Sequence, residues 1–450
     1  MENYMRYLPL DNKDRSQMLG AIGVKDIEDL FECIPKQARS SELFDLPCHK
    51  PESEVEKYMI RLSDKSINAS SVPFFCGAGA YKHHVPSSVD HLIQRSEFLT
   101  AYTPYQPEIS QGTLQVLFEF QSQVAILTGM EVANASMYDG STACAEAVVM
   151  AKRVTKKHKA IIAPGLHPHY SLATKTLASS VDIDVCVLDS EISSDYEVID
   201  LINDETACIV VQSPNVFGEI VDLTPIAEKA HQHKALLIAV FTEPVALGLI
   251  KPPGEQGADI VVGEGQGIGV GLNFGGPHVG LFACNKKLVR QMPGRICGET
   301  IDADGNRAFV LTLSTREQHI RRDKATSNIC TNSGLCCLAF SIHMSLLGGK
   351  GLRKLAILNH EKANLLAARI DKINGAKVLN SSFFNEFAVE LDKCAEDVVD
   401  SLASKNILGG VPFSRLNKAG AKDILLICAT EIVDQHDIDT LCSALEEELR

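Results

Sequence analysis

The chain has 450 residues, 45% of them apolar and 22% charged, which is enough to build two or three domains and excludes a wholly disordered protein. The formal net charge of −14 would repel phosphate backbones, so nucleic acid is not an expected partner. The 14 cysteines include no Cys-x-x-Cys pair, which argues against zinc ribbons and a secreted disulfide framework and favours a reducing cytosol.

Residues 1–70 predict an N-terminal helical arm rather than a domain, because prolines at 35, 47 and 51 divide them into short segments. The start of this arm contains no apolar run of signal-peptide length. The most apolar stretch, residues 235–250, is interrupted by Glu243 and Pro244 and is shorter than the ~20 residues of a membrane span. We therefore expect a cytoplasmic protein without a membrane partner.

Residues 71–335 predict a large α/β domain. Apolar residues at helical spacing predict a helix between Gly112 and Gly129, and Ser141 is a good N-cap for a second helix. Short runs rich in valine and isoleucine follow, separated by helix-length segments such as 223–233. Continuous apolar strands between helices are typical of a parallel sheet that is covered on both faces. The expected strands are 159–163, 181–188, 207–212, 235–240, 259–263 and 279–284.

Residues 336–450 predict a small α+β C-terminal domain. A helix that begins at Gly334 leads into it and is followed by a glycine-rich break at 348–351 and a second helix. Strand, helix, strand and helix patterns then alternate to the C-terminus. These patterns cover 387–391, 395–405, 425–428 and the residues from Asp437 onward.

The glycine run at 263–271 follows an expected strand. It contains no G-x-G-x-x-G in any register and opens no helix, so we interpret it as a loop that allows close backbone approach rather than as a dinucleotide site. The sequence also contains no P-loop and no G-x-S-x-G elbow.

Candidate metal ligands are few. Three histidine pairs lack a second ligand cluster at a recognisable spacing, so we interpret them as surface or hydrogen-bonded histidines and expect no metal. The Asp302-Ala-Asp-Gly305 segment resembles the start of a calcium loop, but its glycine comes too early, and we expect a turn. The histidine pairs are His83 with His84, His167 with His169, and His231 with His233.

The turn Gly140-Ser141-Thr142 lies at the start of an expected helix. Free N–H groups and the positive end of a helix dipole can bind an anion there. Ser and Thr at this position also simply cap helices. Both interpretations stay open on the residues alone.

Residues 102–111, which we call the tyrosine–proline loop, are the densest polar and aromatic segment. Two prolines stiffen a backbone that carries many hydrogen-bonding groups, which suits a binding surface. The alternative is a packed connection between the arm and the large domain. The candidate binding residues are Tyr102, Tyr105, Gln106, Glu108 and Ser110.

Five segments together closely resemble the P-protein family, the decarboxylating glycine dehydrogenases. The length and N-terminus resemble the alpha chain of the form that is split into two subunits. The resemblance covers essentially the whole chain, and the stretch from Arg316 to Asn332 is highly specific. The other segments are 103–112, 138–143, 274–277 and 292–295.

The resemblance implies a fold-type-I pyridoxal-phosphate architecture with a large α/β domain and a small C-terminal domain. It also implies that the complete enzyme decarboxylates glycine, releases CO2 and passes the aminomethyl group to the lipoyl arm of the H-protein. The implied partners are a beta subunit, in an assembly of two alpha and two beta chains, and the H-protein, with a functional link to the T-protein and L-protein.

Two positions then decide what this chain contributes. The resemblance places the cofactor lysine in the loop after 259–263, where this chain has Gln266, and an acid at the end of 235–240, where it has Val240. Neither side chain can form the Schiff base or keep the pyridine ring protonated. Glu243 lies three residues beyond Val240. We therefore expect no catalytic residue on this chain and expect pyridoxal phosphate to be bound mainly by the beta subunit.

In this interpretation the tyrosine–proline loop reaches the site or substrate channel of the partner, and the Gly140–Thr142 turn is a relic of a phosphate cup. Two alternatives remain. The chain could be a stand-alone pyridoxal-phosphate enzyme that uses another lysine, such as Lys324, or a purely structural scaffold of the complex.

Overall fold

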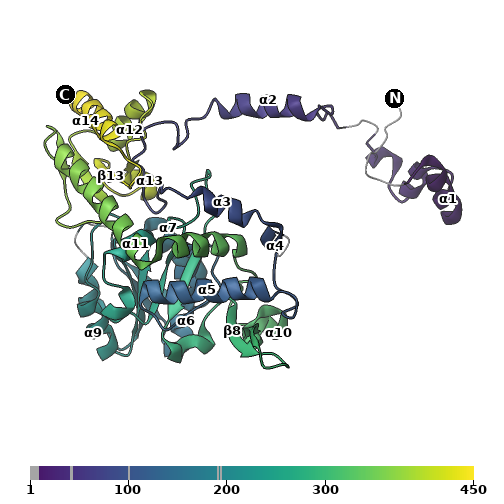
Figure 1. The fold of residues 1–450 in the computed structure, drawn as a ribbon, viewed down its shortest axis with the longest axis horizontal. Coiled ribbons are helices and arrows are strands. Elements are labelled where there is room, and N and C mark those ends of the chain that lie inside the picture. Colours follow the sequence, from purple (N-terminus) through teal and green to yellow (C-terminus); the bar gives the residue numbers. More distant parts are fainter. Residues whose placement is uncertain (1–9, 41–43, 100–101, 190–191, 193–194) are drawn as a thin grey trace. The chain divides into compact units, whose positions relative to one another are not determined.

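A computed structural model describes residues 10–450 except 41–43, 100–101, 190–191 and 193–194 (Figure 1). The contacts divide the chain into two units, Met1–Ser66 and Ile67–Arg450. In the described part of the first unit, no helix has a buried residue. The predicted division into an arm, a large domain and a small domain stays a prediction. The helices of the first unit are α1 (Asn12–Ile22), η1 (Ile27–Phe31), η2 (Lys36–Ala38) and α2 (Glu52–Ser63).

A seven-stranded sheet forms the centre of the second unit, in the order β1-β7-β6-β5-β4-β2-β3. The strands β2 to β6 are parallel, while β7 and β1 are antiparallel at one edge. All six predicted strands are confirmed. The central strands could be predicted because they are buried on both faces, so their sequences are continuous apolar runs. The strands are β1 (Val132–Ala133), β2 (Lys159–Ile162), β3 (Asp184–Val187), β4 (Thr206–Gln212), β5 (Leu236–Phe241), β6 (Ile260–Glu264) and β7 (Gly280–Cys284).

Helices cover both faces of this sheet (Figure 1). One core contains Ile209, Leu237 and Val261 with α5, α9 and α11, and the other contains Val210 and Val240 with α6 and α7. Alternate residues of each strand therefore enter opposite cores. The helices of this region, in chain order, are α5 (Gln111–Thr128), α6 (Gly140–Thr155), α7 (Pro168–Ser179), η3 (Asp195–Glu197), α8 (Val198–Leu201), α9 (Thr224–Gln232), η4 (Pro244–Gly248), η5 (Pro253–Gln256) and η6 (Lys286–Gln291).

A two-stranded hairpin, β8 (Ile296–Ile301) with β9 (Arg307–Thr312), was not predicted. Its outer half is exposed, so it lacks the continuous apolar pattern of the central strands. The predicted turn at Asp302 is confirmed, and it closes this hairpin. The remaining short elements of this unit are α3 (Ser87–Ile93), α4 (Ser96–Leu99), η7 (Ser314–Arg316), α10 (Gln318–Arg321) and η8 (Arg322–Lys324).

The long helix α11 (Gly334–Ile370) lies beside α5, where Phe340 packs edge-on against Phe120 (Figure 1). The predicted break is present, because Gly348 has φ 56° and ψ 178°. Within the described residues, α11 is also long and apolar enough to meet the composition test for a membrane span. The apolar stretch noted from the sequence, residues 235–250, does not include this helix. Partly buried core helices meet the same test, and the packing of Phe340 places this helix in the core.

The small C-terminal sheet is antiparallel, in the order β10-β11-β13-β12. The predicted strand, helix, strand and helix are confirmed. Phe75 belongs to its core, and the Phe75 N–H donates to Leu408 O. We call residues 73–86 the crossing segment, because they contact both sheets. The elements are β10 (Ala376–Val378), β11 (Glu386–Leu391), α12 (Ala395–Ser404), β12 (Val411–Pro412), α13 (Phe413–Leu416), β13 (Ile424–Cys428) and α14 (Gln435–Leu449).

Candidate functional site at the carboxyl edge of the large sheet

Polar side chains gather where β4, β5 and β6 end. Ligands of parallel α/β sheets bind beyond the carboxyl ends of the strands, so this edge is the candidate site. The crossing segment lies against it, because the hydroxyl of Tyr81 is 3.2 Å from Thr242 Oγ1 and donates to Glu386 Oε2 at 2.8 Å. Glu386 begins β11 of the small sheet. The edge is therefore enclosed between the two sheets.

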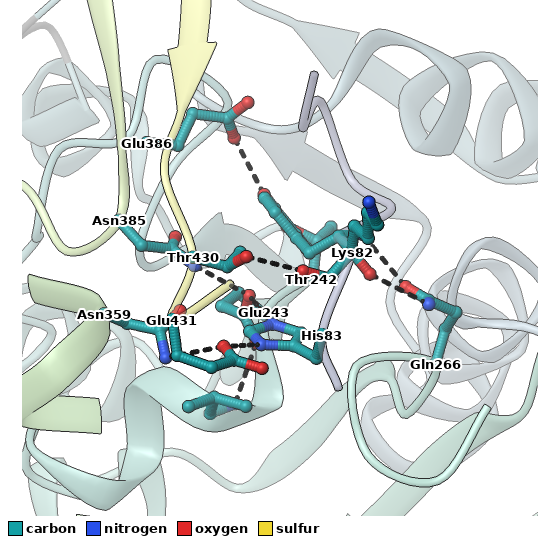
Figure 2. Close-up of polar contacts among 12 residues, drawn as sticks. Lys82, His83, Thr242, Glu243, Gln266, Asn359, Asn385, Glu386, Thr430 and Glu431 are labelled. Carbon is teal, nitrogen blue, oxygen red and sulfur yellow. Dashed lines mark hydrogen bonds and ion pairs between the residues drawn. The ribbon is translucent and has the colours of Figure 1, made fainter. Parts of the chain in front are cut away.

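Gln266 fastens the crossing segment to the loop after β6 (Figure 2). Its Nε2 donates to the carbonyl oxygens of Tyr81 (3.0 Å) and Val270 (2.8 Å), and its Oε1 accepts from the Tyr81 N–H (2.9 Å). Only 2% of Gln266 is exposed. The described hydrogen bonds of this amide all go to the backbone, so it joins the crossing segment to the loop after β6.

Val240 lies inside β5 and is buried in the core formed with α6 and α7. It brings no polar group to the edge. Glu243, three residues on, has its carboxylate engaged, because Oε2 accepts from Asn385 Nδ2 at 2.9 Å and Oε1 accepts from the Val245 N–H at 2.9 Å. Its remaining partner is His83.

We call His83, Glu243, Glu431, Asn359 and Asn385 the His83 cluster (Figure 2). The ring of His83 lies between two carboxylates, with Nε2 2.8 Å from Glu243 Oε2 and Nδ1 2.8 Å from Glu431 Oε2. Burial alone would lower the pKa of His83, but the two carboxylates raise it to about 10. Both ring nitrogens then donate, and the ring is an imidazolium. It holds the end of β5 and the segment after β13 together.

Glu386, in β11, and Glu431, in the segment after β13, have opposite pKa shifts. Burial acts to raise the pKa of Glu431, but the bonds from His83 lower it to about 2. Burial raises the pKa of Glu386 to about 7, against the bonds from the Ala78 N–H and the Tyr81 hydroxyl. Glu431 is therefore a carboxylate at neutral pH, while Glu386 takes up protons there.

His167 is neutral, unlike His83. Burial lowers the pKa of His167 to about 4. Its Nε2 lies 3.0 Å from Ala78 O and its Nδ1 accepts from the His169 N–H at 3.1 Å, so the proton is on Nε2. Of the other predicted pairs, His231 contacts Asp259 and His233 contacts Asp204.

The turn Gly140–Thr142, which was predicted as a vestigial anion-binding turn, begins α6. Two carboxylates of this chain accept hydrogen bonds from it. Asp139 Oδ1 accepts from the Thr142 N–H at 2.9 Å and from the Ser141 hydroxyl at 2.6 Å. Glu264 Oε2 accepts from the Gly140 N–H at 3.0 Å. Glu264 was not among the predicted site residues, although it is a lone acid inside the glycine run 263–271.

The tyrosine–proline loop lies at the start of α5. Tyr105 is 80% exposed, and Tyr102, Gln106 and Glu108 are also exposed, while Ser110 is half-buried. No hydrogen bond described for residues 102–111 reaches Gln266 or the His83 cluster.

The base of this loop is fixed to β9. Gln111 Nε2 donates to Phe309 O at 2.9 Å, and Gln111 Oε1 accepts from the Phe309 N–H at 2.8 Å. Tyr102 and Leu335 line a mostly apolar cavity of about 390 Å³ beside the loop. The loop therefore presents exposed tyrosine and carboxylate groups from an anchored base.

Comparisons with known proteins add to this picture. The sequence matches the family described as "Glycine cleavage system P-protein" over residues 5–445. Chains from Caulobacter vibrioides and Beijerinckia indica, both named "Probable glycine dehydrogenase (decarboxylating) subunit 1", are 61% and 60% identical over 98% and 99% of this chain and 99% and 100% of their own lengths.

Solved structures are also similar to this chain. A crystal structure described as glycine decarboxylase (P-protein) of the glycine cleavage system, in inhibitor-bound form, has a TM-score of 0.88 at 41% identity and covers 98% of this chain and 99% of its own. A Lactobacillus brevis glutamate decarboxylase has a TM-score of 0.66 at 15% identity, covering 92% of this chain and 96% of its own, and is similar in fold alone.

Proposed function

Because the chain belongs to the glycine cleavage system P-protein family, we propose that it is the alpha subunit of a two-chain P-protein and carries no cofactor lysine. Its fold is the fold-type-I pyridoxal-phosphate architecture that the resemblance predicted. In the proposal, a beta subunit carries the lysine and binds the cofactor, and two alpha and two beta chains form the cytoplasmic enzyme. This enzyme decarboxylates glycine and transfers the aminomethyl group to the lipoyl arm of the H-protein, in functional connection with the T-protein and L-protein.

The observation that carries the proposal is the state of Gln266. Its amide is buried, and its nitrogen and oxygen are both hydrogen-bonded to backbone groups of the crossing segment and the β6–β7 loop. Val240 gives an apolar contact where an acid would pair with a pyridine nitrogen. The donors at the start of α6 are already paired with Glu264 and Asp139. The residues present therefore do not fit a covalently bound pyridoxal phosphate.

A stand-alone enzyme that uses another lysine is the first alternative. Lys324 is exposed in η8, which does not suit a cofactor lysine because such a lysine needs an enclosed site. Lys82 is nearer the edge, since it lies in the crossing segment beside Tyr81. Its Nζ donates to Ala69 O, and burial lowers the pKa of Lys82. Lys82 is therefore the lysine to examine first under this alternative.

Absorbance spectra of the purified chain with pyridoxal phosphate, alone and with the beta subunit, followed by borohydride trapping, test the proposal. We expect the band of lysine-bound cofactor only in the pair, and peptide mapping should find the trapped label only on the beta chain. A label on Lys82, Lys324 or any other lysine of this chain incubated alone would contradict the proposal.

Substitutions in the tyrosine–proline loop distinguish a role of the loop in the substrate channel from the scaffold alternative. Tyr105 and Glu108 are exposed, so Tyr105→Phe and Glu108→Ala should leave folding unchanged. We expect each to lower glycine decarboxylation by the reconstituted pair about tenfold or more, because misplacing a group near a site costs rate rather than assembly. Steady-state rates and gel filtration of the same samples measure the two effects.

The matched control is Glu205→Ala, which removes an exposed carboxylate from the loop before β4. It should change neither rate nor assembly. Unchanged turnover in both loop variants would reject a channel role for the loop, and loss of assembly before loss of turnover would favour the scaffold.

A further inference from the structure

The carboxylate of Glu264 lies at the start of α6, where the end of a helix favours an anion. The helix α6 has 16 residues, and its first N–H groups and positive dipole end face the end of β6. Three backbone N–H groups from three separate segments converge on the Glu264 carboxylate. Gly140 donates to Oε2 at 3.0 Å, while Gln266 and Val279 donate to Oε1 at 3.1 and 2.9 Å.

The surroundings of this carboxylate are closed. Only 3% of Glu264 is exposed. His278 Nδ1 lies 3.7 Å from Oε2, and its contact with the carboxylate raises the pKa of His278. Asp139 accepts hydrogen bonds from the Thr142 N–H and the Ser141 hydroxyl. The described donors at this end of α6 are therefore shared between two carboxylates of the chain itself.

Gly140 allows this arrangement. A Cβ at position 140 would collide with the Tyr170 hydroxyl and would lie 3.0 Å from Glu264 N. Glycine therefore lets β6 approach the start of α6 closely enough for the Glu264 side chain to turn back onto the Gly140 N–H.

We propose that Glu264 is a built-in anion that replaces an external phosphate at the start of α6 and closes this position to phosphate-bearing ligands. The carboxylate supplies the negative charge that the helix dipole and three N–H groups favour, and it does so without a ligand. The inference rests on the proposed function only in naming the excluded ligand, which is pyridoxal phosphate.

Chemical rescue of Glu264→Ala tests the proposal on the full-length chain. This substitution removes a group of the size of acetate and leaves three N–H groups without an acceptor. We expect the thermal midpoint to fall by several degrees and to recover in a saturable way as acetate replaces chloride at constant ionic strength. The control is Val262→Ala in the same strand, which creates an apolar cavity and should not respond to acetate. Equal effects of acetate and chloride on Glu264→Ala would overturn the proposal.

Two further measurements keep the test decisive if Glu264→Ala does not fold. In Glu264→Gln, hydrogen exchange in the first turn of α6 should become at least about tenfold faster, whereas the exposed Glu255→Gln should leave it unchanged. Unchanged exchange in Glu264→Gln would contradict the role of the carboxylate.

For the wild-type chain, phosphate should stabilise no more than sulfate at equal concentration. Saturable stabilisation by phosphate would show an open site and overturn the inference. None of these readouts depends on which subunit borohydride labels, so failure here is distinguishable from failure of the half-enzyme proposal.

Discussion

We expect His83→Gln to lower the free energy of unfolding by about 3–5 kcal/mol, because removing one partner of a buried ion pair leaves charge without compensation. The His83 ring contacts Glu243 and Glu431 at 2.8 Å each, and all three side chains are largely buried. A glutamine can donate to one carboxylate but brings no positive charge. Urea unfolding of the full chain, followed by circular dichroism, measures the loss.

The neighbouring His84 provides the control. Its side chain is exposed and only its backbone N–H contacts Glu431, so His84→Gln should change stability by less than about 0.5 kcal/mol. Equal stability of His83→Gln and His84→Gln would show that the imidazolium contributes nothing to the junction of the two sheets.

The same pair of carboxylates gives the pH dependence its sign. The pKa of His83 is raised from 6.5 to about 10 in the folded chain, so its contribution is complete below pH 6.5 and is lost as the pH rises to about 10. Glu431 behaves oppositely, because its pKa is lowered from 4.5 to about 2 and its contribution disappears as the pH falls through that range. Stability measured from pH 6.5 to 10 should therefore fall more steeply in the wild-type chain than in His83→Gln.

The sequence predicts most clearly the strands that are buried on both faces of the sheet. Strands β4, β5 and β6 are buried on both faces, so every residue is under the same apolar constraint and the run is visible in one sequence. The hairpin of β8 and β9 has an exposed outer half, and Glu299 pairs with Arg307 on its surface. That mixed pattern resembles a loop, which is why the hairpin was missed.

The candidate site also contains some residues that the sequence identifies and others that it does not. Gln266 and Val240 were identified because the resemblance assigns a chemical role to each position. The His83 cluster joins residues 160 and 348 positions apart, and no local spacing connects them. The pKa values of His83 and Glu386 arise from burial and from partners that only the fold brings together. A single sequence therefore shows that the cofactor lysine and the acid are missing. It does not show which buried charged residues contact each other at the same edge of the sheet.

We expect Gln266→Lys to destabilise the chain by about 2–4 kcal/mol and to give no absorbance band of lysine-bound pyridoxal phosphate. The lysine would leave the Tyr81 N–H without its acceptor, which costs about 1–3 kcal/mol, and would place a charge where 2% of the residue is exposed. Replacing one residue also leaves Val240 apolar and Glu264 bonded to Gly140 N. Urea unfolding and a cofactor titration of the variant test both parts.

Gln266→Met is the uncharged reference, because it removes the hydrogen bonds of the Gln266 amide without adding a charge. The difference in stability between the methionine and lysine variants then measures the net effect of the buried ammonium group, including any hydrogen bond that it donates to the Tyr81 or Val270 carbonyl. This difference should shrink as the pH rises and the lysine loses its proton. A lysine-bound cofactor band from Gln266→Lys alone would contradict the argument, since it would mean that one residue separates this chain from a cofactor-binding one. The contacts of Glu264 and the apolar position of Val240 indicate instead that a lysine at position 266 alone does not make a cofactor site.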